Sequence, residues 1–335
     1  MLRPLPLAAA LLAVSAAPGA LAAQQAEIRE WPVPWEKSRP RDPAVAPDGR
    51  IWFVGQEGNY VAVLDARTGA MKRYEIDAGA HPHTVVLDAQ GTPWYAGNRN
   101  ATIVKLDPAS GTLTRFPMPK GAEDPHTMVF DRAGDLWFTV QQGNHVGRLR
   151  PSTGKVDLVA MRAPGSRPYG IVLDSKGRPW FDLFGSNRIG TIDPKTLALD
   201  EVVLADRKSR PRRIGVTSDD RIWWGDYTKG LLGVYDPQTK RIEEFPLPGG
   251  LSALPYAMGV DHKDRIWLAE TGSQPNRLVG FDPKTRKFFG ATNVPSGGGT
   301  VRHMVFDPKT RVFWFGTDAN TVGRAKVPEG EAGVS

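Results

Sequence analysis

The sequence predicts an all-β fold, a seven-bladed β-propeller with four antiparallel strands in each blade. A tryptophan recurs along the 335 residues, at Trp52, Trp94, Trp137, Trp180, Trp223, Trp267 and Trp314. The intervals are 42, 43, 43, 43, 44 and 47 residues. Self-similarity at a period in the forties, with several short strands per unit, is typical of propellers. Seven copies therefore predict seven blades in one domain, residues 24–335.

The third repeat shows how each unit is built. A proline-led loop precedes an apolar strand, a turn covers Asp131 to Gly134, and a second strand runs through Trp137. The turn before the fourth strand carries Asp-Pro in several repeats, as at Asp107-Pro108, where proline presets φ and the aspartate caps the turn. We therefore expect these aspartates to serve turns and the tryptophans to serve the core. The four strands of this repeat are expected near residues 126–130, 135–140, 145–150 and 155–161.

The two ends of the chain are expected to share a blade. The seventh repeat stops after a third strand near residues 321–327. Residues 26–34 precede the first repeat and match the last strand of a blade, as in residues 241–248. The N-terminal segment (about 26–34) is therefore predicted to complete the last blade and close the ring, which removes exposed sheet edges.

Residues 1–23 are predicted to be a signal peptide. Arg3 supplies the positive charge, residues 5–17 the apolar region, and Ala20-Leu21-Ala22 a cleavage site. The apolar run is short for a membrane span. The chain has no cysteine, so neither a lipoprotein anchor nor a disulfide is expected. We expect an exported protein, periplasmic or secreted, that is a monomer after signal removal.

The chain is basic, with a formal net charge of +7. Its lysines and arginines are spread over every repeat instead of forming a long run. This distribution is typical of a solvated surface and does not favour a nucleic-acid partner or a membrane partner. A small polar or anionic molecule is the expected ligand, and a protein partner stays open.

Polar residues recur where the innermost strand of each blade begins. Eleven positions before each tryptophan stand Arg41, His83, His126, Tyr169, Arg212, Tyr256 and His303. Three of the six histidines share this position, and His81 lies two residues before His83. Since these strands surround the central channel, the clustering predicts a ligand site at one mouth of that channel. The alternative is that these polar residues satisfy buried backbone groups.

The same face is expected to bind negative charge. Arginine forks bind carboxylate or phosphate through two parallel hydrogen bonds. Asp226 and Glu270 each lie three residues after the tryptophan of their repeat, where the second strand is expected to end on the same face. The predicted substrate-binding set is Arg41, Tyr169, Arg212, Tyr256, Asp226 and Glu270. In the alternative interpretation Arg212 pairs with Asp226 and Arg41 with Asp42, which would leave no net attraction.

The repeat resembles the virginiamycin B lyase, or streptogramin lyase, family over essentially the whole mature chain. The residues that carry the resemblance are D-R-A-G-D-L-W-F-T-V-Q-Q-G-N-H-V-G-R-L at 131–149 and R-I-E-E-F-P-L-P at 241–248. The resemblance implies a seven-bladed propeller. It also implies, for lyase members, opening of a cyclic depsipeptide by elimination, with a histidine base and Mg²⁺.

The site residues that the resemblance implies are mostly replaced. It implies glutamates at the positions of Val301 and Thr317 and histidines at those of His303 and Tyr256, so only His303 matches. A similar set occurs elsewhere in the ring, with Asp for Glu. We therefore expect His126 and His303 to be the catalytic candidates. Mg²⁺ or a similar divalent metal would have as ligands His83, Asp124 and His126.

Two functions follow from the sequence. The first is a lyase or hydrolase that acts on a small polar or anionic molecule of the cyclic ester or lactone class. The second is a non-catalytic propeller that binds a ligand or a protein and has lost the metal carboxylates. Propellers host many functions, so the fold does not decide between them.

Overall fold

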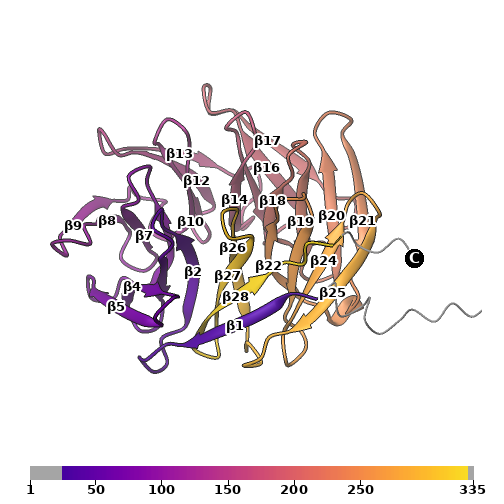
Figure 1. The fold of residues 1–335 in the computed structure, drawn as a ribbon. Helices are drawn as coiled ribbons and strands as arrows, with labels where there is room; N and C mark the ends of the chain where they lie inside the picture. Colours follow the sequence, from indigo (N-terminus) through magenta and orange to yellow (C-terminus); the bar gives the residue numbers. More distant parts are fainter. Residues whose placement is uncertain (1–24, 331–335) are drawn as a thin grey trace, which may run out of the picture.

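The computed structural model describes residues 25–330, so the predicted signal peptide, residues 1–23, lies outside the described residues. The described residues form seven four-stranded sheets (Figure 1). The innermost strands of neighbouring sheets contact one another in a closed ring, whose axis we call the channel. The predicted all-β propeller with seven blades is thus confirmed. In the described residues, the single helical segment is too short to cross a membrane.

Each of the first six blades is a meander from the channel outward. Blades one to three contain β2 (Pro40–Val45), β3 (Ile51–Gly55), β4 (Tyr60–Asp65) and β5 (Ala70–Glu75); β6 (Pro82–Leu87), β7 (Pro93–Gly97), β8 (Thr102–Leu106) and β9 (Leu113–Pro117); β10 (Pro125–Phe130), β11 (Leu136–Val140), β12 (His145–Arg150) and β13 (Lys155–Ala160). Blades four to six contain β14 (Pro168–Leu173), β15 (Pro179–Leu183), β16 (Arg188–Ile192) and β17 (Leu199–Val203); β18 (Pro211–Val216), β19 (Ile222–Asp226), β20 (Leu231–Asp236) and β21 (Arg241–Pro246); β22 (Pro255–Val260), β23 (Ile266–Glu270), β24 (Arg277–Asp282) and β25 (Lys287–Asn293). The 3₁₀ turn η1 (Gly250–Ser252) precedes β22.

Blade seven joins the two ends of the chain. It contains β26 (Val301–Asp307), β27 (Val312–Thr317), β28 (Thr321–Lys326) and the N-terminal β1 (Glu27–Pro32), which pairs antiparallel with β28. Asn320 links the C-terminal part of blade seven to the segment after β1, because its side-chain amide donates to the carbonyls of Val33 at 3.1 Å and Trp35 at 2.9 Å. The predicted closure of the ring is confirmed.

The repeated residues serve the local roles that the sequence predicted. Trp137 is buried in the core, and its indole nitrogen donates to Asp131, six residues earlier, at 3.0 Å. Asp107 caps its turn by accepting from the backbone nitrogen of Ala109 at 2.9 Å. Tryptophan and turn aspartate therefore stabilise the repeat and belong to its structure.

A β-bulge occurs in the innermost strand of every blade. In blade three Pro125 pairs with Val140, but the next aligned pair is Met128 with Phe138. The same slip occurs in the other six blades. A bulge interrupts the alternation of side chains along a strand. As a result, two consecutive residues of one strand, such as His126 and Thr127, both contact groups from other blades near the axis.

Blade seven has a different register from the one that its tryptophan suggests. Val305 pairs with Trp314, nine residues later, whereas Val129 pairs with Trp137, eight residues later. Six residues separate the paired Phe306 and Phe313 of blade seven, whereas five separate the equivalent pair Phe130 and Leu136, and this extra residue shifts β26 by one place. Arg302, and not His303, therefore corresponds to His126, and the placement of His303 in the predicted ring is corrected.

Candidate functional site

The residues that begin the bulges meet at one end of the channel. We call this set the mouth ring, and its members are Arg41, His83, His126, Tyr169, Arg212, Tyr256 and Arg302. The rings of His83 and His126 lie with centroids 3.4 Å apart, and His126 lies 4.3 Å from Tyr169. The hydroxyl groups of Tyr169 and Tyr256 are hydrogen-bonded. Six of the seven residues predicted to converge here do so.

The next residue of each strand forms a second layer, the inner ring. Its members are Asp42, Thr84, Thr127, Gly170, Arg213, Ala257 and His303. Asp42 and Arg213 are buried, and both have left-handed backbone conformations, with φ of 42° and 66°. Such conformations are unfavourable for residues other than glycine. The contacts that these two side chains make across the channel must offset that cost.

Arg213 links four blades through its guanidinium group. It donates to Asp42 of blade one at 3.1 Å, to Thr127 of blade three at 3.2 Å, and to the carbonyl of Arg302 in blade seven at 2.9 Å. Gly170 of blade four packs directly against the backbone of Arg213. Any larger residue there would crowd Arg213, because its Cβ would lie 3.1 Å from the Cα of Arg213. The inner ring is therefore a packed polar layer that blocks the channel.

Asp42 is the anion shared by two arginines. Arg41 donates to it at 3.0 Å and also donates to Gln56 at 3.0 Å. Burial alone would raise the pKa of Asp42, but Arg213 and Arg41 outweigh burial and hold this pKa well below its ordinary value. One carboxylate faces two guanidinium groups, so the pair of Arg41 with Asp42 leaves positive charge in excess.

Arg212 is held among aromatic rings. Its guanidinium carbon lies 3.5 Å from the ring centroid of Tyr256, 4.5 Å from Phe184 and 4.6 Å from Tyr227. Within residues 25–330, it forms no ion pair with a carboxylate, and its Nε finds no hydrogen-bond partner. The alternative pair with Asp226 is therefore absent. Cation–π contacts stabilise the guanidinium group without neutralising its charge.

The two mouth-ring tyrosines differ in acidity. Burial alone would raise the pKa of Tyr256, but Arg212 and Arg41 lower it to about 7. Burial and the neighbouring Tyr256 raise the pKa of Tyr169. Tyr169 thus stays a hydrogen-bond donor toward an ionisable Tyr256. This pair gives the mouth ring a group that changes charge near neutral pH.

The histidines of the two rings are neutral. Burial, followed by Arg41, holds the pKa values of His83 and His126 well below the ordinary value. Burial and then Arg213 lower the pKa of His303 to about 3. A histidine of such low basicity is a weak general base at neutral pH.

Three acidic residues that the sequence placed in the site accept hydrogen bonds from backbone nitrogens of loops. Asp124 accepts from the backbone nitrogens of Gln142 at 2.6 Å and Gly143 at 3.0 Å. Asp226 accepts from the backbone nitrogen of Arg210 at 3.1 Å. Glu270 accepts from the backbone nitrogen of Gly249 at 2.8 Å and also pairs with Arg277. These carboxylates stabilise loops on the mouth face.

The donor set does not fit a divalent metal. No three His, Asp or Glu side chains in the described part of the chain are grouped so that they could hold a metal ion, and the set His83, Asp124 and His126 is included in that result. The register of blade seven also moves the implied histidine position from His303 to Arg302, a cation. Arginines stand where a metal site needs anionic oxygen ligands.

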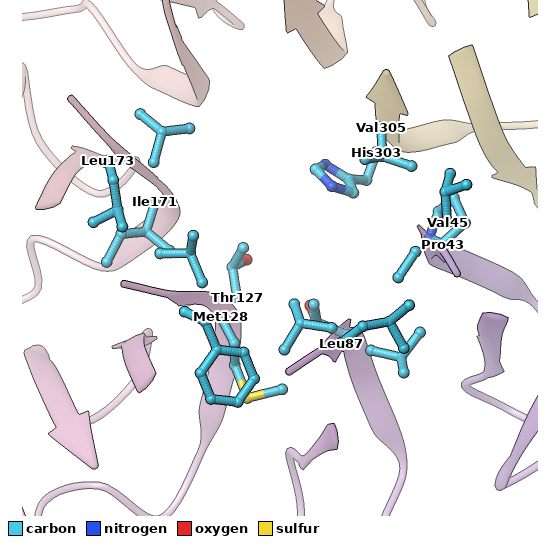
Figure 2. Close-up of a pocket in the computed structure, with 16 residues that line it drawn as sticks. Pro43, Val45, Leu87, Thr127, Met128, Ile171, Leu173, His303 and Val305 are labelled. Atoms are coloured by element: carbon cyan, nitrogen blue, oxygen red, sulfur yellow. The ribbon is translucent and has the colours of Figure 1, made fainter. Parts of the chain in front are cut away.

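The opposite end of the channel has a different character. A cavity of about 560 Å³ lies between the later residues of β2, β6, β10, β14 and β26 (Figure 2). Its lining is mainly aliphatic and aromatic, and His303 points into it (Figure 2). The polar layer thus separates an arginine-rich mouth from an apolar cavity.

The comparisons with known proteins agree with this architecture. The sequence profile described as the virginiamycin B lyase family matches residues 14–278. The chain belongs to the virginiamycin B lyase family. No curated protein matches this family member in sequence.

Solved structures match this family member closely in shape. Virginiamycin B lyase from Staphylococcus aureus is 20% identical, with a TM-score of 0.82 over 90% of this chain and all of that one. A streptogramin B lyase is 23% identical, with a TM-score of 0.81 over 91% of this chain and 99% of that one. The extracellular domain of a putative one-component system from B. thetaiotaomicron is 16% identical, with a TM-score of 0.68 over 88% of this chain and 42% of that one. At these identities the likeness establishes the fold.

Two residues of this family member's site escaped the sequence interpretation, namely Arg213 and Arg302, and Asp42 was expected only as a partner of Arg41. Asp42 and Arg213 lie one residue after the predicted ring, and strict alternation along a strand would turn them away from the axis. The β-bulge turns the side chains of Asp42 and Arg213 toward the channel axis, and no short sequence motif predicts this bulge. Arg302 could have been found by allowing for the longer connection at residues 307–312, which has six residues where blade three has five.

Proposed function

We propose that this family member binds a small anionic molecule, a carboxylate or a phosphate, at the arginine-rich mouth ring, without a bound divalent metal. The observation that carries the proposal is Arg212, a guanidinium group that is held by aromatic rings and forms no ion pair with a carboxylate in the described residues. We also propose that the chain is exported, on the basis of the signal-peptide pattern of its first 23 residues.

The charge balance of the two rings supports an anionic ligand. Four arginines, namely Arg41, Arg212, Arg213 and Arg302, face the carboxylates of Asp42 and Asp318, which gives 4 − 2 = +2 below about pH 7 and 4 − 3 = +1 once Tyr256 is ionised. Asp182 adds little negative charge at neutral pH, because burial raises its pKa to about 8. The histidines are neutral. An anion would therefore meet uncompensated guanidinium groups, which bind carboxylate and phosphate through forked hydrogen bonds.

A binding experiment with matched variants tests this proposal. Small mono- and dicarboxylates and inorganic phosphate are titrated into the protein by calorimetry, at low and high salt. We expect Arg212→Ala to weaken the affinity of the best anion by about tenfold or more, which corresponds to about 1.4 kcal/mol. Arg221→Ala is the control, since Arg221 is 47% exposed and pairs with Asp219. Equal affinities of the wild type and Arg212→Ala would contradict the proposal.

A second candidate function is elimination without a metal, and the Tyr169–Tyr256 pair favours it. In this reaction the Tyr256 phenolate takes a proton from the carbon beside a carbonyl or carboxylate. The electron pair forms a carbon–carbon double bond, and the bond to the ester or lactone oxygen on the next carbon breaks. Arg212 and Arg41 would stabilise the negative charge that develops on the substrate. Cyclic esters and lactones are the substrate class to test.

Tyr256→Phe separates this candidate from simple binding. It removes the base and keeps the ring that packs on Arg212. If a lactone is opened by the wild type, we expect this variant to bind the anion and to lose turnover. Turnover that persists in Tyr256→Phe would exclude Tyr256 as the base. Binding without turnover in the wild type would leave the non-catalytic function.

A further inference from the structure

The cavity at the end of the channel opposite the mouth ring is a second site with its own chemistry. Its volume of about 560 Å³ falls within the range of small-molecule pockets, about 300–1,000 Å³. Its rim is formed by the last residues of four innermost strands, Val45, Leu87, Phe130 and Leu173. Each of these residues is half-buried, so apolar surface borders a solvent-accessible space.

The floor of this cavity is the inner ring. Thr84, Thr127 and His303 supply the polar groups that line it (Figure 2). Thr84 donates its hydroxyl proton to Asp42 at 2.9 Å, and Thr127 accepts from Arg213 at 3.2 Å. Both threonines are therefore already committed to the ion pair that closes the channel.

His303 differs from the two threonines. Its imidazole faces the cavity (Figure 2) and makes no side-chain hydrogen bond in the described residues. Nδ1 is closed to solvent, so Nε2 is the ring nitrogen that a ligand can reach, and an imidazole nitrogen donates or accepts one hydrogen bond. His303 is thus a polar contact that is free to recognise a ligand.

The charges near the floor restrict what that ligand can be. Behind the floor Asp42 pairs with Arg213 at 3.1 Å and with Arg41 at 3.0 Å, and none of these three side chains lines the cavity. Burial keeps His303 uncharged at neutral pH. A carboxylate or an ammonium group at the floor would lose its hydration without gaining an opposite charge, which is unfavourable. A hydroxyl group needs only one hydrogen bond, which a neutral imidazole provides.

We propose that this cavity binds an uncharged amphiphile, an alkylphenol or a similar alcohol, with its apolar body against Leu87, Phe130 and Leu173 and its hydroxyl group on His303. Transfer of the apolar body from water to the cavity stabilises the complex in proportion to the apolar surface that is buried. The single hydrogen bond to His303 fixes its orientation. This site does not depend on anion binding at the mouth ring.

The occupant is tested with three probes that share one alkyl chain. A 4-alkylphenol, the matching alkylbenzene and the matching 4-alkylbenzoate are titrated into the protein, with binding followed by calorimetry or protein NMR. We expect saturable binding of the phenol with one molecule per chain. The alkylbenzene and the benzoate should each bind about tenfold or more weakly, the loss expected for one hydrogen bond or for an uncompensated charge.

The location is tested with a matched pair of variants. Leu87→Trp fills the cavity from the end of β6, and we expect it to weaken phenol binding about tenfold or more. Val260→Trp changes the last residue of β22, the same register position outside the cavity lining, and should leave binding unchanged. His303→Phe should remove the preference for phenol over alkylbenzene while keeping alkylbenzene binding.

Three results would overturn the proposal. The first is the absence of saturable phenol binding in a wild type whose thermal unfolding shows it to be folded. The second is equal loss in Leu87→Trp and Val260→Trp, which would place the ligand elsewhere. The third is benzoate binding as tight as phenol binding, which would show that the floor accepts charge.

Discussion

At the scale of single residues, position in the channel decides which side chains can react or bind. Arg41, His83 and Tyr169 are nearly inaccessible because the members of the mouth ring pack on one another, whereas Arg212 and Arg302 keep partial exposure. An anion that arrives from solvent therefore meets Arg212 and Arg302 first. The residues beneath them set the charge and the acidity of the site.

We predict that one tyrosine ionises near neutral pH. Arg212 and Arg41 lower the pKa of Tyr256 to about 7, so phenolate absorbance should appear as the pH rises through that value. The phenolate also adds a negative charge beside Arg212. Anion affinity should consequently be highest below pH 7 and fall above it.

The control for this titration is Tyr256→Phe, which should abolish the early absorbance change. Tyr60→Phe is the matched comparison, because burial raises the pKa of Tyr60 to about 12. A titration curve that is the same in the wild type and in Tyr256→Phe would show that another group carries the transition.

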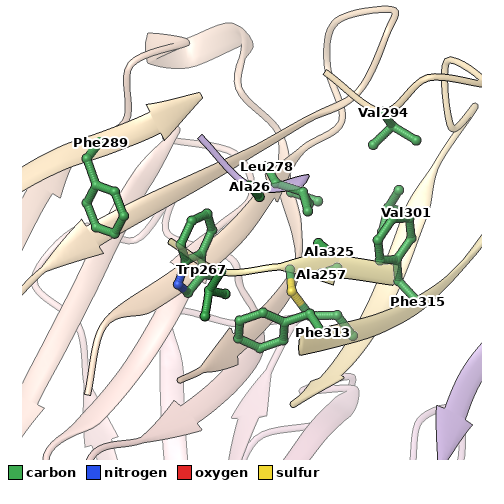
Figure 3. Packing of buried hydrophobic residues seen from close by; sticks show 13 residues of the cluster. Ala26, Ala257, Trp267, Leu278, Phe289, Val294, Val301, Phe313, Phe315 and Ala325 are labelled. Carbon is green, nitrogen blue, oxygen red and sulfur yellow. The ribbon is translucent and has the colours of Figure 1, made fainter. Parts of the chain in front are cut away.

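At the scale of elements, the bulged inner strands shape the site, whereas the N-terminal strand β1 closes the ring. The bulges bring consecutive residues of one strand to the axis, while β1 completes blade seven. Ala26, the residue before β1, packs in one cluster with Ala325 and Phe313 of blade seven and Trp267 of blade six (Figure 3). The closing segment therefore buries apolar surface against two blades in addition to its pairing with β28.

We predict that Arg213 is the most sensitive residue of the inner ring. Arg213→Ala removes contacts to three other blades and leaves the Asp42 charge with one guanidinium partner instead of two. Breaking a buried ion pair in this way costs about 3–5 kcal/mol. Urea denaturation should show this loss in the free energy of unfolding.

Two further variants check the cause. Arg67→Ala is the control, since Arg67 forms an exposed pair with Asp65 and should leave the unfolding midpoint unchanged. Asp42→Asn combined with Arg213→Met should cost less than the sum of the single changes, because the ion pair that both single changes break is then lost only once. Additive losses would argue against a shared interaction.

At the scale of the whole molecule, the propeller encloses ionisable groups whose protonation is linked to folding. His83, His126 and His303 have pKa values depressed by burial and nearby arginines. In the unfolded chain their pKa would be near 6.5, so below that pH the unfolded state binds more protons. The histidines therefore make folding less favourable as the pH falls.

We predict that the free energy of unfolding decreases as the pH is lowered from about 6.5 toward 4. Each buried histidine contributes a slope of at most about 1.4 kcal/mol per pH unit in this window. Urea denaturation at pH values across this range measures the slope. His303→Gln should reduce it, whereas His145→Gln changes a partly exposed histidine at the start of β12, far from the channel axis, and should leave it as it is. A flat profile would contradict the neutral state of the buried histidines.

The sequence by itself determined the seven blades, the four strands in each, the closing strand and the meeting of His83, His126, Tyr169, Arg212 and Tyr256 at one mouth. These features follow from local patterns that repeat, because alternation, turn residues and spacing act within one blade. Only the tertiary structure decided the inner ring, the shift of His303 and the engagement of Asp124 by a loop. Those depend on bulges, on one extra residue in a turn and on contacts between blades, and such contacts link residues as distant as Asp42 and Arg213.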